Sequence, residues 1–183
     1  MRIGLTGSAG TGKTTLALTM AGTLGVPVLH ERMRERLRAG FSLHALTRAE
    51  HRALLRDDAE DLEARAAAAP AGFVADRTPL DFLAFWLCNG YAADDPAGTD
   101  AFAAQARAAV AAWDLIVVLP WGSLPLEDDG IRYANPWHQL HAQTVIEGLC
   151  RRWVAADRLA FLPDTVREPD GRCAWVLRRA QAR

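Results

Sequence analysis

A run of eight residues near the start of the chain has the types and spacing that hold phosphate groups. The run Gly7-Ser8-Ala9-Gly10-Thr11-Gly12-Lys13-Thr14 fits the pattern G-x-x-x-x-G-K-[ST] without a mismatch. In such a loop backbone N–H groups cradle the phosphates, so we expect Lys13 to bridge the β- and γ-phosphates and Thr14 to hold Mg²⁺. The residues assigned to nucleotide binding are Gly7, Ser8, Ala9, Gly10, Thr11, Gly12, Lys13, Thr14 and Thr15.

The lysine of this loop is the only lysine in the chain. Every other residue among the 21 Lys and Arg positions is arginine. A compact ammonium on a flexible stem can reach between phosphate oxygens, whereas a planar guanidinium is wider and would crowd the loop. Lysine at position 13 therefore indicates a chemical requirement. It also excludes the guanine-binding pattern Asn-Lys-x-Asp, because no second lysine is present to supply it.

Charged residues follow two of the predicted strands. Asp76 and Arg77 come at the end of the predicted strand 72–76, and Glu31 comes directly after the predicted strand 26–30. Ligands of an open parallel sheet bind beyond the carboxyl ends of its strands, so these side chains should face the phosphate-binding loop. Asp76 would hold Mg²⁺, and Arg77 would contact phosphate or substrate oxygens. Glu31 would accept the proton of a substrate hydroxyl as it attacks the γ-phosphate.

The residues that follow Glu31 predict a helix that faces the substrate. Glu31, Arg34 and Glu35 are spaced i, i+3 and i+4, which places them on one face of a helix. We therefore assign Glu31, Arg34 and Arg77 to substrate binding.

A fourth signal is the irregular segment 121–135, which is rich in Gly, Pro and acidic residues and contains Arg132. In a phosphotransferase a closing lid at this place would bring a cation onto the phosphates and expel water. The acidic run Glu127-Asp128-Asp129-Gly130 is interpreted as a plain turn.

Alternating strand and helix signals predict one α/β domain over residues 1–183. Short apolar runs, of the kind buried on both faces of a parallel sheet, predict strands at 3–6, 26–30, 72–76, 115–119 and 159–162. A helix should follow the loop from Thr14. Capping patterns predict the starts of four more helices, at Thr47-x-x-Glu50, Thr78-Pro79-Leu80-Asp81, Asp95-Pro96 and Asn135-Pro136. The last element, near residues 173–179, is expected to be a helix.

The bulk properties exclude several classes of protein. A net charge of −1 argues against a dedicated nucleic-acid binder. The three cysteines are far apart in the sequence, which is typical of reduced thiols in the cytosol. No run is long and apolar enough to span a membrane, and the chain enters its first strand without room for a signal peptide. We expect a cytoplasmic protein without nucleic-acid or membrane partners.

Taken together, four motifs resemble one family. The chain contains Gly-x-x-x-x-Gly-Lys-Thr-Thr-Leu from Gly7, Glu31-x-x-Arg34-Glu35, Asp76-Arg77-Thr78-Pro79-Leu80-Asp81 and Asp129-Gly130-x-Arg132. These resemble the AAA_28-type P-loop family, over roughly residues 2–155. That family is similar to the nicotinamide riboside kinase domain of bacterial NAD regulators and, more distantly, to deoxynucleoside and thymidylate kinases. The resemblance implies a P-loop NTPase fold with a five-stranded parallel sheet of order 2-3-1-4-5, flanked by helices, and a lid between strand four and the following helix.

The resemblance also implies an activity. It implies an ATP-dependent kinase that uses Mg²⁺ and transfers the γ-phosphoryl group to a hydroxyl of a nucleoside-like small molecule. Glu31 matches the general base, Asp76 and Arg77 match an acid–arginine pair at the metal and phosphates, and Arg132 matches the lid arginine. The roles of Glu31 and Asp76 could be exchanged. In such kinases a second basic residue usually lies in the helix turn after the lid. At that place this chain has only His138 and His141.

Other functions stay open at this point. The acceptor could be a nucleoside monophosphate, for which Arg34, Arg48 and Arg52 are available, or another small metabolite. An alternative of a different class is an ATP-binding regulatory module with weak hydrolysis. The small-molecule acceptor is the expected partner, and a homodimer is left open.

Overall fold

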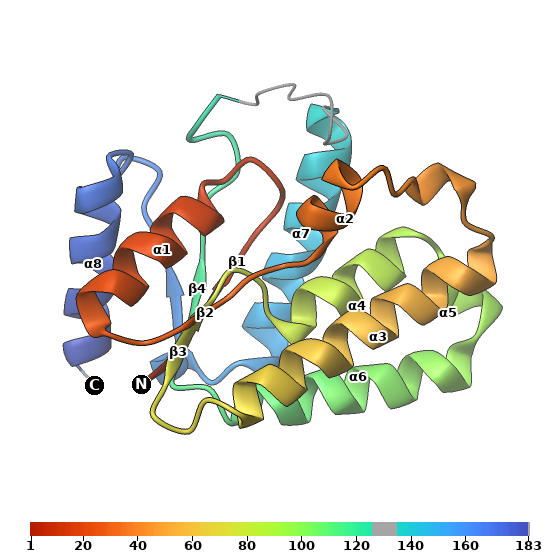
Figure 1. The fold of residues 1–183 in the computed structure, drawn as a ribbon, viewed down its shortest axis with the longest axis horizontal. Coiled ribbons are helices and arrows are strands. Elements are labelled where there is room, and N and C mark those ends of the chain that lie inside the picture. The colour runs from red at the N-terminus through yellow and green to blue at the C-terminus, as the bar shows by residue number, and fades with distance from the viewer. Residues whose placement is uncertain (126–134, 183) are drawn as a thin grey trace.

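The computed structural model describes residues 1–125 and 135–182, with the exception of the Arg34 side chain. Five parallel strands form one sheet in the order β2-β3-β1-β4-β5, which confirms the order implied by the resemblance (Figure 1). The strands are β1 (Arg2–Thr6), β2 (Val28–Leu29), β3 (Phe73–Ala75), β4 (Leu115–Val118) and β5 (Leu159–Phe161). The register pairs Gly4 with Ala75 on one side and with Ile116 on the other.

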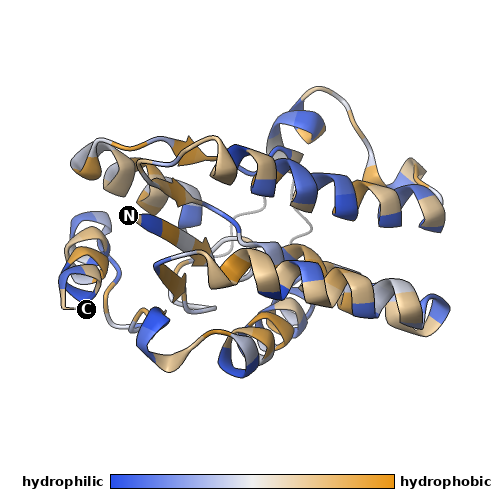
Figure 2. Cartoon of the chain, turned by 90° about the horizontal axis from the view of Figure 1, so that it is seen from below, coloured by the Kyte–Doolittle hydropathy of each residue, from blue (hydrophilic) through white to orange (hydrophobic). Residues whose placement is uncertain are grey.

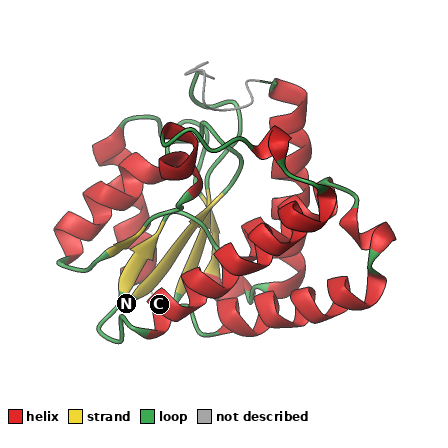
Figure 3. Ribbon diagram, turned by 45° about the vertical axis from the view of Figure 1, so that its right-hand side comes forward, coloured by secondary structure: helices red, strands yellow, loops and turns green. Residues whose placement is uncertain are grey.

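Helices cover both faces of this sheet, and the strands lie between the two layers (Figure 3). One layer consists of α1 (Lys13–Leu24) and α8 (Pro169–Gln181). The other consists of α3 (Arg48–Ala67), α4 (Pro79–Cys88), α6 (Pro96–Ala111) and α7 (Pro136–Trp153). Short helices in the described connections are α2 (Met33–Arg38), η1 (Leu43–Ala45), α5 (Tyr91–Asp94) and η2 (Ala156–Arg158).

Each face of the sheet has its own hydrophobic core. In β4, Leu115 and Val117 pack with α1 and α8, whereas Ile116 and Val118 pack with α3, α4, α6 and α7. This alternation follows from the two-residue period of a strand, and burial on both faces explains why the strand is continuously apolar. Figure 2 shows hydrophilic residues interspersed with hydrophobic ones along the outer helices, as expected for helices with one face in water.

The predicted helix starts are confirmed by the capping geometry. The Thr47 hydroxyl accepts from the Glu50 N–H, and a second capping box joins Thr78 to Asp81. Asp95 and Asn135 also accept backbone N–H groups at the starts of α6 and α7. Prolines at the first helical positions fit here because a proline has no N–H to leave unpaired.

The topology brings the carboxyl ends of the strands together at the edge opposite the two chain termini (Figure 1). The phosphate-binding loop leaves β1 at this edge. The segments that follow β2 and β3 there contain Glu31 and Asp76. Among the residues that the structure describes, no helix has both the length and the apolar character to cross a membrane.

Candidate active site

The phosphate-binding loop, residues 7–14 and here called the P-loop, connects β1 to α1. Gly12 adopts a left-handed conformation, with φ of 83°, that disfavours residues with a side chain. Among the described residues, no side chain caps the start of α1. The first N–H groups of the helix are therefore available to an anion, and the helix dipole favours negative charge at the same place.

Lys13 is buried at the centre of this loop. Its Nζ donates to the carbonyls of Gly7 and Ser8, each at 2.7 Å, and to the Thr11 hydroxyl at 3.3 Å. Burial, with the nearby Arg77 charge as a second cause, lowers the pKa of the Lys13 ammonium to about 7. The carboxylates of Asp81, Glu31 and Asp76 only partly offset this lowering. Phosphate oxygens would add negative charge next to Nζ, and so would favour the protonated lysine.

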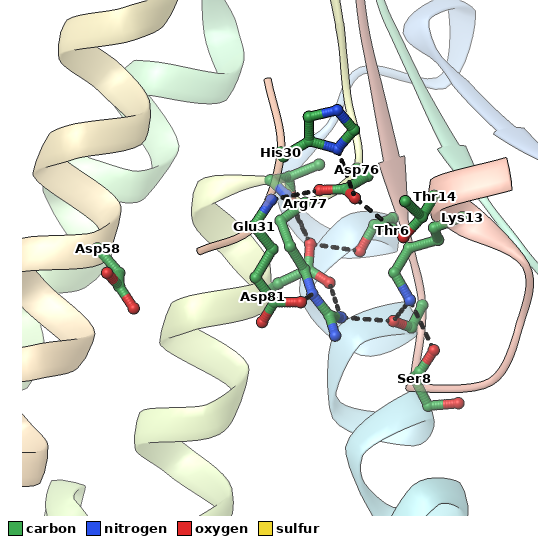
Figure 4. A network of polar contacts seen from close by, with 12 residues as sticks. Thr6, Ser8, Lys13, Thr14, His30, Glu31, Asp58, Asp76, Arg77 and Asp81 are labelled. Carbon is green, nitrogen blue, oxygen red and sulfur yellow. Dashed lines mark hydrogen bonds and ion pairs between the residues drawn. The ribbon is translucent and has the colours of Figure 1, made fainter. Parts of the chain in front are cut away.

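Asp76, at the end of β3, connects the P-loop to the segment after β2. Its Oδ2 accepts a hydrogen bond from the Thr14 hydroxyl at 3.0 Å, and its Oδ1 accepts the Glu31 backbone N–H at 2.7 Å (Figure 4). His30 Nδ1 lies 3.6 Å from the same carboxylate. Asp76 is 4% exposed, so an interpretation of Asp76 and Arg77 as a solvated surface ion pair does not apply.

The pair Thr14–Asp76 fits a Mg²⁺ ion. This metal prefers oxygen ligands, and with a nucleotide it takes one or two carboxylates, phosphate oxygens and water rather than a complete set of protein ligands. A hydroxyl and a carboxylate within hydrogen-bond distance of each other, at the mouth of the P-loop, supply that protein share. In the part of the chain that the structure describes, no group of three or more His, Cys, Asp or Glu side chains could hold a metal alone.

Arg77 joins three parts of the site. Its Nε donates to Glu31 Oε2 at 3.1 Å, and its Nη1 donates to the Gly7 carbonyl at 2.8 Å and to Asp81 Oδ1 at 3.0 Å (Figure 4). The guanidinium also lies 5.1 Å from the centre of the Phe85 ring. The Glu31 and Asp81 carboxylates raise the pKa of Arg77 against the effect of burial, so this cation is permanent. Arg77 therefore holds the Glu31 carboxylate beside the P-loop.

Asp81 is a site residue whose role the sequence did not show. The sequence predicted only a helix cap, and the cap is present, since Asp81 Oδ2 accepts the Thr78 N–H at 2.8 Å. The same oxygen also accepts the hydroxyls of Thr6 and Thr78, while Oδ1 accepts Arg77. This fully buried carboxylate connects β1, the start of α4 and the arginine that holds Glu31.

A small pocket of about 10 Å³, room for about one water molecule, lies next to Glu31, between β2, α3 and α4. Asp58 of α3 lies on its wall and pairs with Arg36 of α2 at 2.6 Å, well away from the network around Asp76 (Figure 4). Burial raises the pKa of Asp58, although Arg36 opposes this shift. The lining residues are Leu29, His30, Glu31, Arg32, Asp58, Leu62, Arg65, Arg77 and Phe82.

The structure thus brings Lys13, Thr14, Glu31, Asp76 and Arg77 together at one edge of the sheet. One local prediction is wrong. α2 begins at Met33 with Arg32 as its N-cap, so Glu31 precedes the helix and does not share a helix face with Glu35. The Glu31 N–H is bound by the Asp76 carboxylate, and the helix begins two residues later.

Two predicted residues lie outside what the structure describes. Arg132 and the acidic turn belong to residues 126–134, and the Arg34 side chain is not described. Their assignments therefore stay predictions.

Two further residues contact the P-loop from outside, and neither was predicted from the sequence. Gln143 of α7 accepts the Ser8 N–H at 2.8 Å and donates to the Leu119 carbonyl at 3.0 Å. Arg172 of α8 donates to the Thr11 carbonyl at 2.7 Å. Both lie on buried faces of amphipathic helices, where a polar residue is the only signal the sequence offers.

Comparison with known proteins identifies the family. The AAA_28 family, described as an AAA domain, matches residues 2–157. The chain belongs to the AAA_28 family. A comparison with curated proteins found no match. The match to AAA_28 includes every strand-end residue of the site but ends before β5 and α8, so Arg172 lies outside it.

Solved structures share the AAA_28 chain's fold at low sequence identity. A deoxyadenosine kinase from M. mycoides with bound dATP superposes with a TM-score of 0.68 at 14% identity, covering 99% of this chain and 100% of that one. The NadR protein in complex with NAD and AMP-PNP has a TM-score of 0.66 at 18% identity, covering 98% of this chain. The chain spans about half of NadR, 48% of its length. YorR from Bacillus subtilis, in complex with phosphorylated GDP, has a TM-score of 0.60 at 12% identity over 99% of this chain and 96% of YorR. At these identities the likeness establishes the P-loop fold.

Proposed function

We propose that this protein is an ATP-dependent kinase that phosphorylates a hydroxyl of a nucleoside-like small molecule. One observation carries the proposal. The Glu31 carboxylate is held by Arg77, and the Glu31 N–H is bound by Asp76, so a second carboxylate lies beside the Thr14–Asp76 metal pair. A site that only binds a nucleotide does not need this second carboxylate, whereas transfer to a hydroxyl needs a proton acceptor.

The contacts favour Glu31 over Asp76 as the general base. Both oxygens of Asp76 accept hydrogen bonds, from Thr14 and from the Glu31 backbone. Glu31 Oε2 accepts from Arg77, and the described residues place no donor on Oε1. Glu31 also lines the small pocket between β2, α3 and α4, and we propose that an acceptor binds at the mouth of this pocket. We therefore assign the acceptor proton to Glu31 Oε1 and the metal to Asp76.

The cations have separate tasks in this proposal. Lys13 would bind the β- and γ-phosphates with the backbone N–H groups of the P-loop. Thr14 and Asp76 would hold Mg²⁺, which supplies positive charge against the charge that develops on the phosphates. Arg77 would act mainly by orienting Glu31, with its Nη1 facing the P-loop carbonyl of Gly7. Arg132 stays the proposed lid arginine.

The solved neighbours guide the choice of acceptors. A deoxyadenosine kinase and the NadR protein in complex with NR share the fold, so nucleosides with a free hydroxyl are the first candidates. The pocket beside Glu31 is lined by both acidic and basic side chains together with Leu29, Leu62 and Phe82.

The test is an ATP-consumption screen with purified protein. The panel contains deoxynucleosides, ribonucleosides including nicotinamide riboside, nucleoside monophosphates and sugars, with a Lys13→Ala variant as the blank. We expect ADP formation that depends on one class of nucleoside and is absent in the blank. Turnover with monophosphates alone would move the acceptor class to nucleotides. ATP binding without acceptor-stimulated turnover would contradict the kinase and favour a regulatory module.

A further inference from the structure

Arg172 contacts three segments around the P-loop. It lies in the first turn of α8 and is 2% exposed. Its Nη1 donates to the Thr11 carbonyl at 2.7 Å, its Nη2 to the Ser123 hydroxyl at 2.9 Å, and its Nε to the Val166 carbonyl at 2.9 Å. One guanidinium thus connects the P-loop with the segments that follow β4 and β5.

The charge of Arg172 has no carboxylate partner among the residues that the structure describes. Its three described acceptors are two carbonyls and a hydroxyl, and within residues 1–125 and 135–182 no carboxylate pairs with it. Burial lowers the pKa of this guanidinium from its ordinary value. A buried cation without a carboxylate partner is costly for a fold. A bound anion beyond the Thr11–Gly12 peptide would offset part of that cost.

The contact with Thr11 determines the direction of a P-loop N–H. The Thr11 carbonyl and the Gly12 N–H belong to the same peptide unit, which is trans, so they point in opposite directions. Because Arg172 holds the carbonyl on the outer side, the Gly12 N–H points away from Arg172. A Cβ at position 12 would lie 2.9 Å from Arg172 Nη1, which is too close for an ordinary contact. The position of the guanidinium therefore requires glycine at position 12.

We propose that Arg172 is a positioning residue for nucleotide phosphates: it orients the Thr11–Gly12 peptide so that the Gly12 N–H faces the bound phosphates. This inference rests on the nucleotide binding of the proposed function. It makes α8, which lies outside the residues matched to the family, a part of the nucleotide site. A residue with only a stabilising role would affect the melting temperature but not the affinity of the folded protein for phosphates.

The experiment measures equilibrium binding of Mg-ATP and of Mg-tripolyphosphate, a probe that contacts the phosphate site without a base. The variants are Arg172→Lys, Arg172→Met and Ser123→Ala, with Arg178→Met as the matched control on the exposed face of the same helix. Binding is measured well below each variant's melting temperature. We expect Kd for both ligands to rise about tenfold or more in Arg172→Met and about threefold in Ser123→Ala, while Arg178→Met stays within about twofold.

Three outcomes separate this inference from the kinase proposal. Wild-type protein that binds ATP but phosphorylates no acceptor, with the expected loss in Arg172→Met, contradicts the kinase and supports the role of Arg172. Unchanged Kd in Arg172→Met overturns the inference whatever the turnover. If Arg172→Met does not fold, Arg172→Lys and Ser123→Ala decide, because both keep the volume of the site nearly intact. Wild-type affinity in both Arg172→Lys and Ser123→Ala would then overturn the proposed role of Arg172.

Discussion

The Thr14 hydroxyl donates a hydrogen bond to the Asp76 carboxylate over 3.0 Å, although the two residues are 62 positions apart. The contact joins the start of α1 to the end of β3, which are neighbours only because β1 pairs with β3. It places a hydroxyl and a carboxylate together at the P-loop. Oxygen ligands that are already in position reduce the cost of ordering them when a metal binds.

Replacement of Asp76 tests the metal assignment. Asp76→Asn keeps the shape of the side chain but removes its negative charge, so we expect the Mg²⁺ concentration for half-maximal ATP turnover to rise about tenfold or more. The measurement is a Mg²⁺ titration of initial rates at saturating ATP. Asp57→Asn, at an exposed position of α3, is the control and should leave the titration unchanged. An unaltered Mg²⁺ dependence in Asp76→Asn would remove Asp76 from the metal site.

Glu31→Gln tests the general base. The amide can still accept from Arg77 but cannot take a proton, so kcat should fall by about 10²- to 10⁴-fold while ATP affinity stays near that of the wild type. The rate is followed with the acceptor found in the screen, and ATP affinity is measured separately by titration. Glu35→Gln, exposed in α2, is the matched control. If Glu31→Gln keeps wild-type turnover, the base assignment moves to Asp76.

Lys13→Arg tests the requirement for an ammonium. Nζ lies 2.7 Å from two carbonyls in a buried site, which leaves no room for a planar guanidinium without displacing the loop. We expect a folded protein whose phosphoryl transfer is reduced by about 10²-fold or more. Circular dichroism verifies folding, and Arg38→Lys, the reverse exchange at an exposed position, should have no effect. Near-normal activity would mean that lysine at this position carries no chemical requirement.

Two capping boxes of different burial allow a matched test of Asp81. Asp81 is fully buried and also accepts from Thr6 and Arg77, whereas Glu50 caps α3 at the surface. Asp81→Asn should lower the free energy of unfolding by about 2–4 kcal/mol, because Arg77 and two hydroxyls lose a charged acceptor. Glu50→Gln should cause a much smaller change, since glutamine also serves at this position of a capping box. Equal effects in urea titrations would contradict a special role for Asp81.

His51 predicts a pH dependence of stability. Burial lowers the pKa of this imidazole. Its Nδ1 lies 2.8 Å from the Tyr91 hydroxyl, and the guanidinium groups of Arg48 and Arg52 lie over the Tyr91 ring. The unfolded chain therefore binds a proton at higher pH than the folded chain. The free energy of unfolding should fall as the pH drops below about 6.5, and this loss ends once the folded-state pKa is passed.

The measurement is a series of urea titrations between about pH 7.5 and 5.5. His51→Gln should flatten the profile in this window, whereas His44→Gln, at an exposed position, should keep the wild-type profile. Identical slopes for wild type and His51→Gln would exclude His51 as the source.

Much of the fold could be predicted from short-range patterns. The P-loop, four of the helix caps and the five strands are encoded by neighbouring residues, because turns, caps and strand periodicity depend on contacts within a few positions. The predicted strand 26–30 was longer than β2, which ends at Leu29 because the backbone then turns toward Asp76. The helical last element was also confirmed and runs over Pro169–Gln181.

The sequence by itself determined that the P-loop precedes α1 and that Glu31 and Asp76 follow two of the strands. Only the tertiary structure decided which of these groups form hydrogen bonds with one another. The contacts Arg77–Glu31, Thr6–Asp81 and Arg172–Thr11 join residues 46, 75 and 161 positions apart. No local pattern specifies them, because they depend on how far each helix is rotated and shifted when its apolar face packs against the sheet.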